Sequence, residues 1–222
     1  MQTEIDAVSV VWFHDRQLRE RDWPVMSRGG GASGAWEAID ANHRYNGLLW
    51  READRARRLD VPPAEIAAGQ RLIDRYDRKR SDAVESIDKV LLAGLHHVVR
   101  RPGARLSSDT AGVMIDRLSG LALHIHHLRA QALRAGADAG ADAAHIGACT
   151  AKLERLLAQR HDLMSCLDCL LADARAGLAY FTAGRQARME SDLALDTCLD
   201  GQVGESATID APEAVRRRHA PA

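Results

Sequence analysis

Hydrophobic residues recur every three or four positions in four long stretches of the chain, which is the period of an amphipathic α-helix. A shorter stretch of the same kind begins near Ile5 and is expected to end at Trp23-Pro24, because a proline cannot continue a helix. Segments rich in glycine or proline separate the long stretches, which cover residues 36–58, 64–98, 109–136 and 143–181. The pattern predicts an all-α fold, an antiparallel up-and-down bundle of about four long helices with an extra N-terminal helix packed across it.

The same pattern divides the chain into four parts. Residues 1–26 are predicted to hold the N-terminal helix, and the glycine-rich stretch 27–34, with the sequence SRGGGASG, to be a linker. The helical bundle is expected to span 35–190. Residues 191–222 are acidic, contain glycine and show no apolar period, so we expect a disordered tail there.

Composition narrows the class of protein. Hydrophobic residues make up 46% of the chain and aromatic residues only 4%, which favours helices over strands. The 30 basic and 31 acidic side chains nearly cancel, so neither a membrane nor nucleic acid is expected as a partner, and binding of either would need a local patch. The N-terminal segment lacks the pattern of a secretory signal, and a cytoplasmic protein with reduced cysteines is predicted.

Two arginines interrupt the apolar stripes. Arg80 and Arg160 each stand where a hydrophobic residue would continue the stripe, and a buried guanidinium must be paired. Asp54, Glu85 and Asp116 are the candidate partners. This pattern predicts a charged pocket between helices that binds an anion, unless the arginines reach the surface or form purely structural ion pairs.

Acidic residues crowd the third predicted helix and suggest a magnesium site. Oxygen clusters of this kind suit Mg²⁺, and Asp54 together with Glu85 and Asp88 forms the candidate ligand set. The alternative is a solvated helix face, because interleaved basic residues make ordinary pairs four positions apart, such as Glu85 with Lys89.

The spacing of two histidines and two cysteines would allow a zinc site, but such a site is not expected. His124 and His127 share one helix face, and Cys166 and Cys169 share another, so the four side chains could form a tetrahedral site. The two cysteines lie in the middle of a helix beside its apolar stripe, where a free cysteine is expected to be buried as a small hydrophobic residue. No established cofactor is therefore predicted, with magnesium more plausible than zinc.

Four segments in order carry a family resemblance: NHRYNGLLWREADRAR, QRLIDRYDRKRSDAVESID, SDTAGVMIDRLSGLALHIHHLR and QRHDLMSCLDCLLAD. They resemble the bacterial domain-of-unknown-function family numbered 4254, which implies an all-helical fold and no established activity. Matching positions include His43, Asn46, Trp50, Asp54, Arg57, Asp74, Arg80, Asp82, Glu85, Asp88, Asp116, Arg117 and His127. The chain departs from the pattern at Arg51, Ala53, Gln70, Asp77, Ser81 and His124. A catalytic site, if the family has one, is therefore expected to be incomplete here.

These observations lead to three hypotheses about function. The first is a bundle that binds a small anionic ligand or a partner helix through a charged interhelical pocket. Its predicted ligand-binding residues are His43, Asn46, Asp54, Arg57, Arg80, Asp116, Arg117 and His127. The second is a magnesium-dependent hydrolase of a phosphorylated or nucleotide-like substrate, in which Asp54, Glu85 and Asp88 hold the metal. The third is a scaffolding bundle, whose heptad-like stripes would favour a homo-oligomer.

Overall fold

A computed structural model describes residues 5–25, 34–58, 62–137 and 143–183 of the chain. The elements in order are α1 (Ala7–Gln17), α2 (Ala35–Ala56), α3 (Pro63–Gly94), β1 (Arg105–Leu106), α4 (Ala111–Ala137), α5 (Ala143–Arg175) and β2 (Ala179–Tyr180). The predicted all-α bundle is confirmed. The predicted tail and all of the linker except Gly34 lie outside the described residues.

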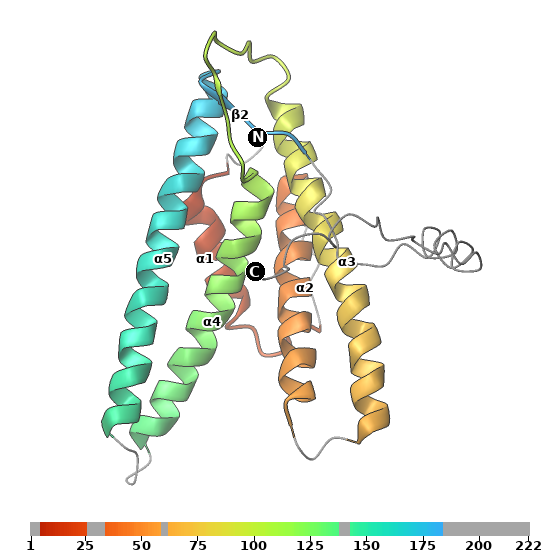
Figure 1. Cartoon of the computed structure of the whole chain (residues 1–222), viewed down its shortest axis with the longest axis vertical. Coiled ribbons are helices and arrows are strands. Elements are labelled where there is room, and N and C mark those ends of the chain that lie inside the picture. The colour runs from red at the N-terminus through yellow and green to blue at the C-terminus, as the bar shows by residue number, and fades with distance from the viewer. Residues whose placement is uncertain (1–4, 26–33, 59–61, 138–142, 184–222) are drawn as a thin grey trace, which may run out of the picture. The chain divides into compact units, whose positions relative to one another are not determined.

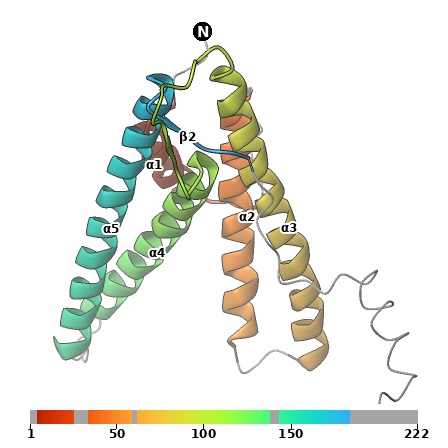
Figure 2. The ribbon, with the colours of Figure 1, turned by 45° about the horizontal axis from the view of Figure 1, so that its top comes forward.

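The bundle consists of two antiparallel helical hairpins, one of α2 and α3 and the other of α4 and α5 (Figure 1). The helix α1 packs against the hairpin of α4 and α5. Figures 1 and 2 show the hairpins diverging toward the C-terminal ends of α2 and α4. None of the described helices is both long and apolar enough to cross a bilayer.

The hydrophobic core lies where the hairpins are closest. Ile39, Ile87, Ile115, Leu118 and Leu167 are completely buried, one or two from each long helix. These residues belong to the stripes seen in the sequence, because one face of each helix must be covered. Where the hairpins diverge, some hydrophobic residues of the helices are exposed to solvent.

Two residues cap the N-terminus of α4: Thr110, which directly precedes the helix, and Asp88 of α3. The Thr110 hydroxyl accepts a hydrogen bond from the Val113 N–H (3.2 Å), so Thr110 occupies the N-cap position. The buried Asp88 of α3 accepts from the Gly112 N–H (2.7 Å) and from the Thr110 hydroxyl (2.5 Å). A negative charge at a helix N-terminus is favourable. Asp88 thus ties α3 to α4.

The last predicted helix ends earlier than its apolar stripe indicated. The helix α5 stops at Arg175, and Gly177 follows with a φ of 71°, a conformation that side chains with a Cβ rarely adopt. A Cβ at Gly177 would also lie 2.4 Å from the Val99 carbonyl oxygen. The chain then forms β2, which pairs in parallel with β1 so that Arg105 faces Ala179 and Leu106 faces Tyr180. Periodicity could not reveal this two-stranded sheet because each strand has only two residues.

Candidate functional site

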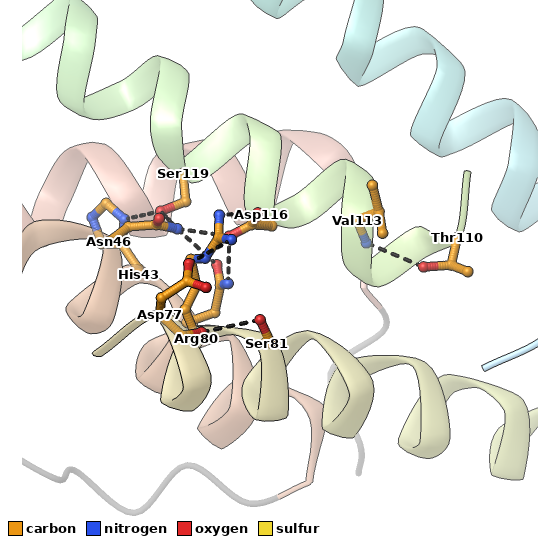
Figure 3. Close-up of polar contacts among 10 residues, drawn as sticks. His43, Asn46, Asp77, Arg80, Ser81, Thr110, Val113, Asp116 and Ser119 are labelled. Carbon is orange, nitrogen blue, oxygen red and sulfur yellow. Dashed lines mark hydrogen bonds and ion pairs between the residues drawn. The ribbon is translucent and has the colours of Figure 1, made fainter. Parts of the chain in front are cut away.

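A polar network lies between α2, α3 and α4, with the Asp116 carboxylate at its centre (Figure 3). Asp116 is 8% exposed. Its Oδ1 accepts from the Nδ2 atoms of Asn42 (2.7 Å) and Asn46 (2.8 Å), and its Oδ2 accepts from Nη1 of Arg80 (3.2 Å). The charge of this buried acid is therefore matched by donors from the other two helices, as burial of a charge requires.

Arg80 connects the network to the solvent. Its Nη2 lies 2.9 Å from Oδ1 of Asp77, whose side chain is 43% exposed, while the Arg80 side chain is 26% exposed. The Arg80 Nε is buried without a hydrogen-bond partner in the described part of the chain. The prediction that Arg80 faces inward and pairs with a buried acid is confirmed. Of the three candidate partners, Asp116 is the one that it binds.

A second branch of the network ends on a buried histidine. Asn46 donates through Nδ2 to the Ser119 Oγ (3.0 Å), which lies 2.8 Å from Nδ1 of His43. Ser119 and His43 are completely buried, and burial lowers the pKa of His43 to about 3, against the opposing effect of the His14 carbonyl. The imidazole is therefore neutral at physiological pH and shares a hydrogen bond with the serine hydroxyl. A serine and histidine without any exposed surface cannot meet a substrate, so this pair is structural.

His43 also belongs to a ring stack that holds α1. Its ring lies 4.3 Å from that of His14 in α1 and 4.6 Å from that of Trp23, centroid to centroid. His14 is completely buried, and neither of its ring nitrogens has a partner among the described residues. Burial is the main cause that lowers the pKa of His14 well below its usual value, followed by the charges of His43 and Arg160. A Cβ at Gly47 would lie 2.4 Å from the Trp23 ring, so glycine is needed there.

A cavity of about 500 Å³ lies at the diverging end of the hairpins, and we call it the hairpin cleft. It is lined by the C-terminal part of α2, the start of α3 and one residue of α4. The lining residues are Trp50, Arg51, Glu52, Asp54, Arg55, Arg58, Pro62, Glu65 and His127. Residues of both hairpins therefore line the cleft.

Aromatic rings close one side of the hairpin cleft. The rings of Trp50 and His127 stack with centroids 4.5 Å apart and an interplanar angle of 4°. His124 meets the same tryptophan edge-on at 4.8 Å. Burial lowers the pKa of His127, with further lowering by His126 and an opposing effect of Asp54. The stack thus places a neutral, flat platform beside the charged side chains of α2.

Three arginines and three carboxylates make up the charged lining of the cleft. Arg51 and Arg55 are four residues apart and lie on one side of α2, and Arg58 follows just beyond the C-cap residue Arg57. Arg55 forms an ion pair with Glu65 of α3. The Glu52 Oε2 atom is buried, with no hydrogen-bond partner in the described ranges. The cleft therefore offers both cationic and anionic groups within one small space.

The eight predicted ligand-binding residues do not form one site. His43, Asn46, Arg80 and Asp116 share the polar network, whereas Asp54 and His127 line the hairpin cleft. Arg117 points elsewhere and pairs with Asp109 at 2.8 Å. Arg57 is exposed at the end of α2, and neither site contains it. Assignment of these residues to a single pocket was wrong, because the network and the cleft lie at different heights of the bundle.

The predicted magnesium ligands are also dispersed. Asp88 is committed to the N-terminus of α4, Glu85 pairs with Lys89 at 2.9 Å, and Asp54 lies in the hairpin cleft. Within the described residues, no three His, Cys, Asp or Glu side chains are grouped so that they could hold a metal ion. The pairing of Glu85 with Lys89 is the alternative that the sequence left open.

The cysteines and Arg160 give mixed outcomes. Cys166 and Cys169 are exposed, because the α5 surface that bears them is not covered by another described helix. The expectation that they are buried as small hydrophobic residues was therefore wrong. Arg160 is 13% exposed and binds Asp15 of α1 at 3.0 Å. Its inward orientation was predicted correctly, but its partner was not among the three candidates.

Two central residues of the network, Asn42 and Ser119, were missed. Asn42 precedes Asn46 by four residues, and Ser119 follows Asp116 by three, so each pair lies on one helix face. These spacings could have identified them. A search for charged residues passed over them because both are uncharged.

Comparisons with known proteins support a family assignment. Neither the curated proteins nor the solved structures contain a match to this chain. A family model matches residues 36–183, a range that includes the polar network and the hairpin cleft and excludes α1. The chain therefore belongs to the family described as "Protein of unknown function (DUF4254)".

Proposed function

We propose that the protein is a ligand-binding helical bundle that takes up a small organic anion in the hairpin cleft. The observation that carries this proposal is the cleft itself, in which Arg51, Arg55 and Arg58 lie beside the Trp50–His127 stack. A volume of about 500 Å³ suits a small molecule. A guanidinium binds carboxylates and phosphates through two parallel hydrogen bonds, which makes arginine the natural anion ligand.

Arg51 is the best candidate for the first anion contact. Arg55 already pairs with Glu65, whereas Arg51 is exposed and has no ion-pair partner in the part of the chain that the structure describes. A ligand carboxylate could therefore bind Arg51 without displacing a protein carboxylate. The neighbouring Glu52 and Asp54 disfavour a compact polyanion and favour a ligand with one anionic group and an apolar part against Trp50.

The polar network supports this site by fixing the relative position of α2 and α4. Asn46 and Trp50 are four residues apart on one face of α2, and Ser119 and His127 are about two turns apart on α4. The hydrogen bond from Asn46 to Ser119 thus sets the register in which Trp50 meets His127. In this proposal the network positions the platform and does not touch the ligand.

The geometry favours a small molecule over the other occupants considered. A partner helix inserts an apolar face, whereas this cleft is lined mainly by charged side chains. Hydrolysis assisted by magnesium would need Asp54, Glu85 and Asp88 together, and Asp88 instead caps α4. We therefore propose binding and no reaction.

The test is calorimetric titration of the protein with a panel of monocarboxylates, dicarboxylates and monophosphate esters at low ionic strength. At least one ligand class should bind, and Arg51→Gln should weaken that binding by on the order of tenfold, the loss of one charge-assisted contact. Arg129→Gln is the matched control, because Arg129 is exposed on α4 and does not line the cleft. Absence of binding across the panel, or equal binding by both variants, would refute the proposal.

A further inference from the structure

The end of the bundle opposite the hairpin cleft carries a second surface, independent of the proposed ligand site. We call it the basic tip and define it by Val99, Arg100, Arg101, Leu106, Leu178 and Tyr180. It consists of the connection between α3 and α4 and the segment after α5 (Figure 1). Backbone hydrogen bonds from Arg101 to Gly177 (2.9 Å) and from Arg105 to Leu178 (2.9 Å) join the two segments into one surface.

Apolar side chains of the basic tip face the solvent. Val99 is 84% exposed, Leu106 55% and Leu178 45%. Leu106 faces Tyr180 across the β1–β2 pair, so these two side chains lie on the same side of the sheet, and the exposed Leu178 directly precedes β2. Ala179 occupies the other side and is buried. The outer side of this small sheet is therefore an apolar surface on which Leu106 and Leu178 are exposed.

Basic side chains predominate around these apolar residues. Arg100 lies over the Tyr180 ring, with its Cζ 4.0 Å from the ring centroid, and Arg101 and Arg105 follow in the same loop. Neither residues 95–108 nor 174–183 contain an aspartate or glutamate. Asp173 pairs with Arg105 at 3.3 Å and offsets one of the three charges. The chain is nearly neutral as a whole, so this concentration of positive charge is local.

We infer that the basic tip docks on an anionic membrane surface. Exposed aliphatic side chains beside arginines and an amphipathic aromatic ring match the two requirements of interfacial binding, insertion of apolar groups and attraction to acidic headgroups. The connection between α3 and α4 projects beyond the helix ends (Figures 1 and 2), a convex shape that suits a soft lipid interface better than a peptide, which needs a groove. This local patch departs from the expectation, drawn from overall charge, that no membrane is a partner.

The test is co-sedimentation of the full chain with vesicles of phosphatidylcholine alone or mixed with phosphatidylserine. The protein should bind only the mixed vesicles, and added salt should weaken the binding. Each arginine near such a surface contributes roughly fivefold to partitioning, so Arg100→Gln combined with Arg101→Gln should reduce binding by on the order of twentyfold. Leu106→Ser should reduce it several-fold without a change in charge.

A matched control separates the basic tip from other positive charge. Arg129→Gln combined with Arg155→Gln removes the same charge from exposed positions on α4 and α5 and should leave binding nearly unchanged. The control is needed because the sequence also has a basic run at Arg216–Arg218. Failure to bind mixed vesicles, or equal losses in both double variants, would overturn the inference. Binding to polyglutamate is measured in parallel. If the tip double variant still bound mixed vesicles but no longer bound polyglutamate, the inference would also fail, because that result would identify an acidic protein partner.

Discussion

Acidification should destabilise the protein through the buried pair His14 and His43. Both side chains are completely buried, and neither ring nitrogen of His14 has a hydrogen-bond partner in the described residues. Burial opposes the charged imidazolium, which is why the pKa of each residue lies below its ordinary value and that of His43 falls to about 3. The perturbation to apply is a change from pH 7 to pH 5.

The sign follows from proton linkage. An unfolded histidine titrates near 6.5, so between that pH and the folded pKa the unfolded chain binds more protons than the folded chain. Stability is therefore full above about pH 6.5 and is lost as the pH falls toward the folded value. Each unit between 6.5 and the folded pKa costs about 1.4 kcal/mol, which sets a limit of about 2 kcal/mol for each histidine at pH 5. His43, with a pKa of about 3, reaches that limit, and His14 adds to the loss in the same direction.

The assay is urea unfolding at both pH values, compared between wild type and His14→Phe. Phenylalanine keeps a ring in the stack with His43 and removes one titrating group. Because carboxylates such as Asp6 and Asp88 titrate in both proteins, their effects cancel in the comparison. The variant should lose less stability than wild type between pH 7 and pH 5, by up to about 2 kcal/mol. Equal losses in the two proteins would show that His14 is not a buried neutral group, and the reasoning would fail.

Two further predictions concern single buried contacts. Arg80→Ala should lower the free energy of unfolding by about 1–3 kcal/mol. This is less than the loss of a partner from a wholly buried ion pair would cost, because amide donors still bind Asp116. A change under about 0.5 kcal/mol in denaturant unfolding would place Arg80 outside the network. Asp88→Ala should cost about 1–3 kcal/mol, since it strips the buried Gly112 N–H of its acceptor. Glu85→Ala, on the same helix, serves as its control and should stay within about 0.5 kcal/mol, so similar losses in the two variants would argue against the capping role.

Helical periodicity was sufficient to predict the all-α class and the positions of the long helices. Burial of one face imposes the three-to-four residue spacing, and residues such as Ile39 and Leu118 carry that signal locally. The interruption of the stripe at Arg80 likewise predicted a buried ion pair, because an inward arginine requires a carboxylate partner. These features depend on near neighbours in sequence and are therefore readable from it.

The choice among partners depended on tertiary structure. Asp54, Glu85 and Asp116 were equally good acids for Arg80 in the sequence, and only the packing of α3 on α4 selected Asp116. The same packing turned Asp88 from a candidate metal ligand into the cap of α4. An acidic residue has the same sequence signature in either role.

The separation of the polar network from the hairpin cleft was also beyond the sequence. Asn46 and Trp50 are one helical turn apart, yet the first lies where the hairpins meet and the second where they diverge. A helical period shows which face a residue occupies, but it carries no information on the angle between two hairpins. That angle is set by side-chain packing between distant segments, so only the folded chain determines which residues meet across the bundle and which line a cavity.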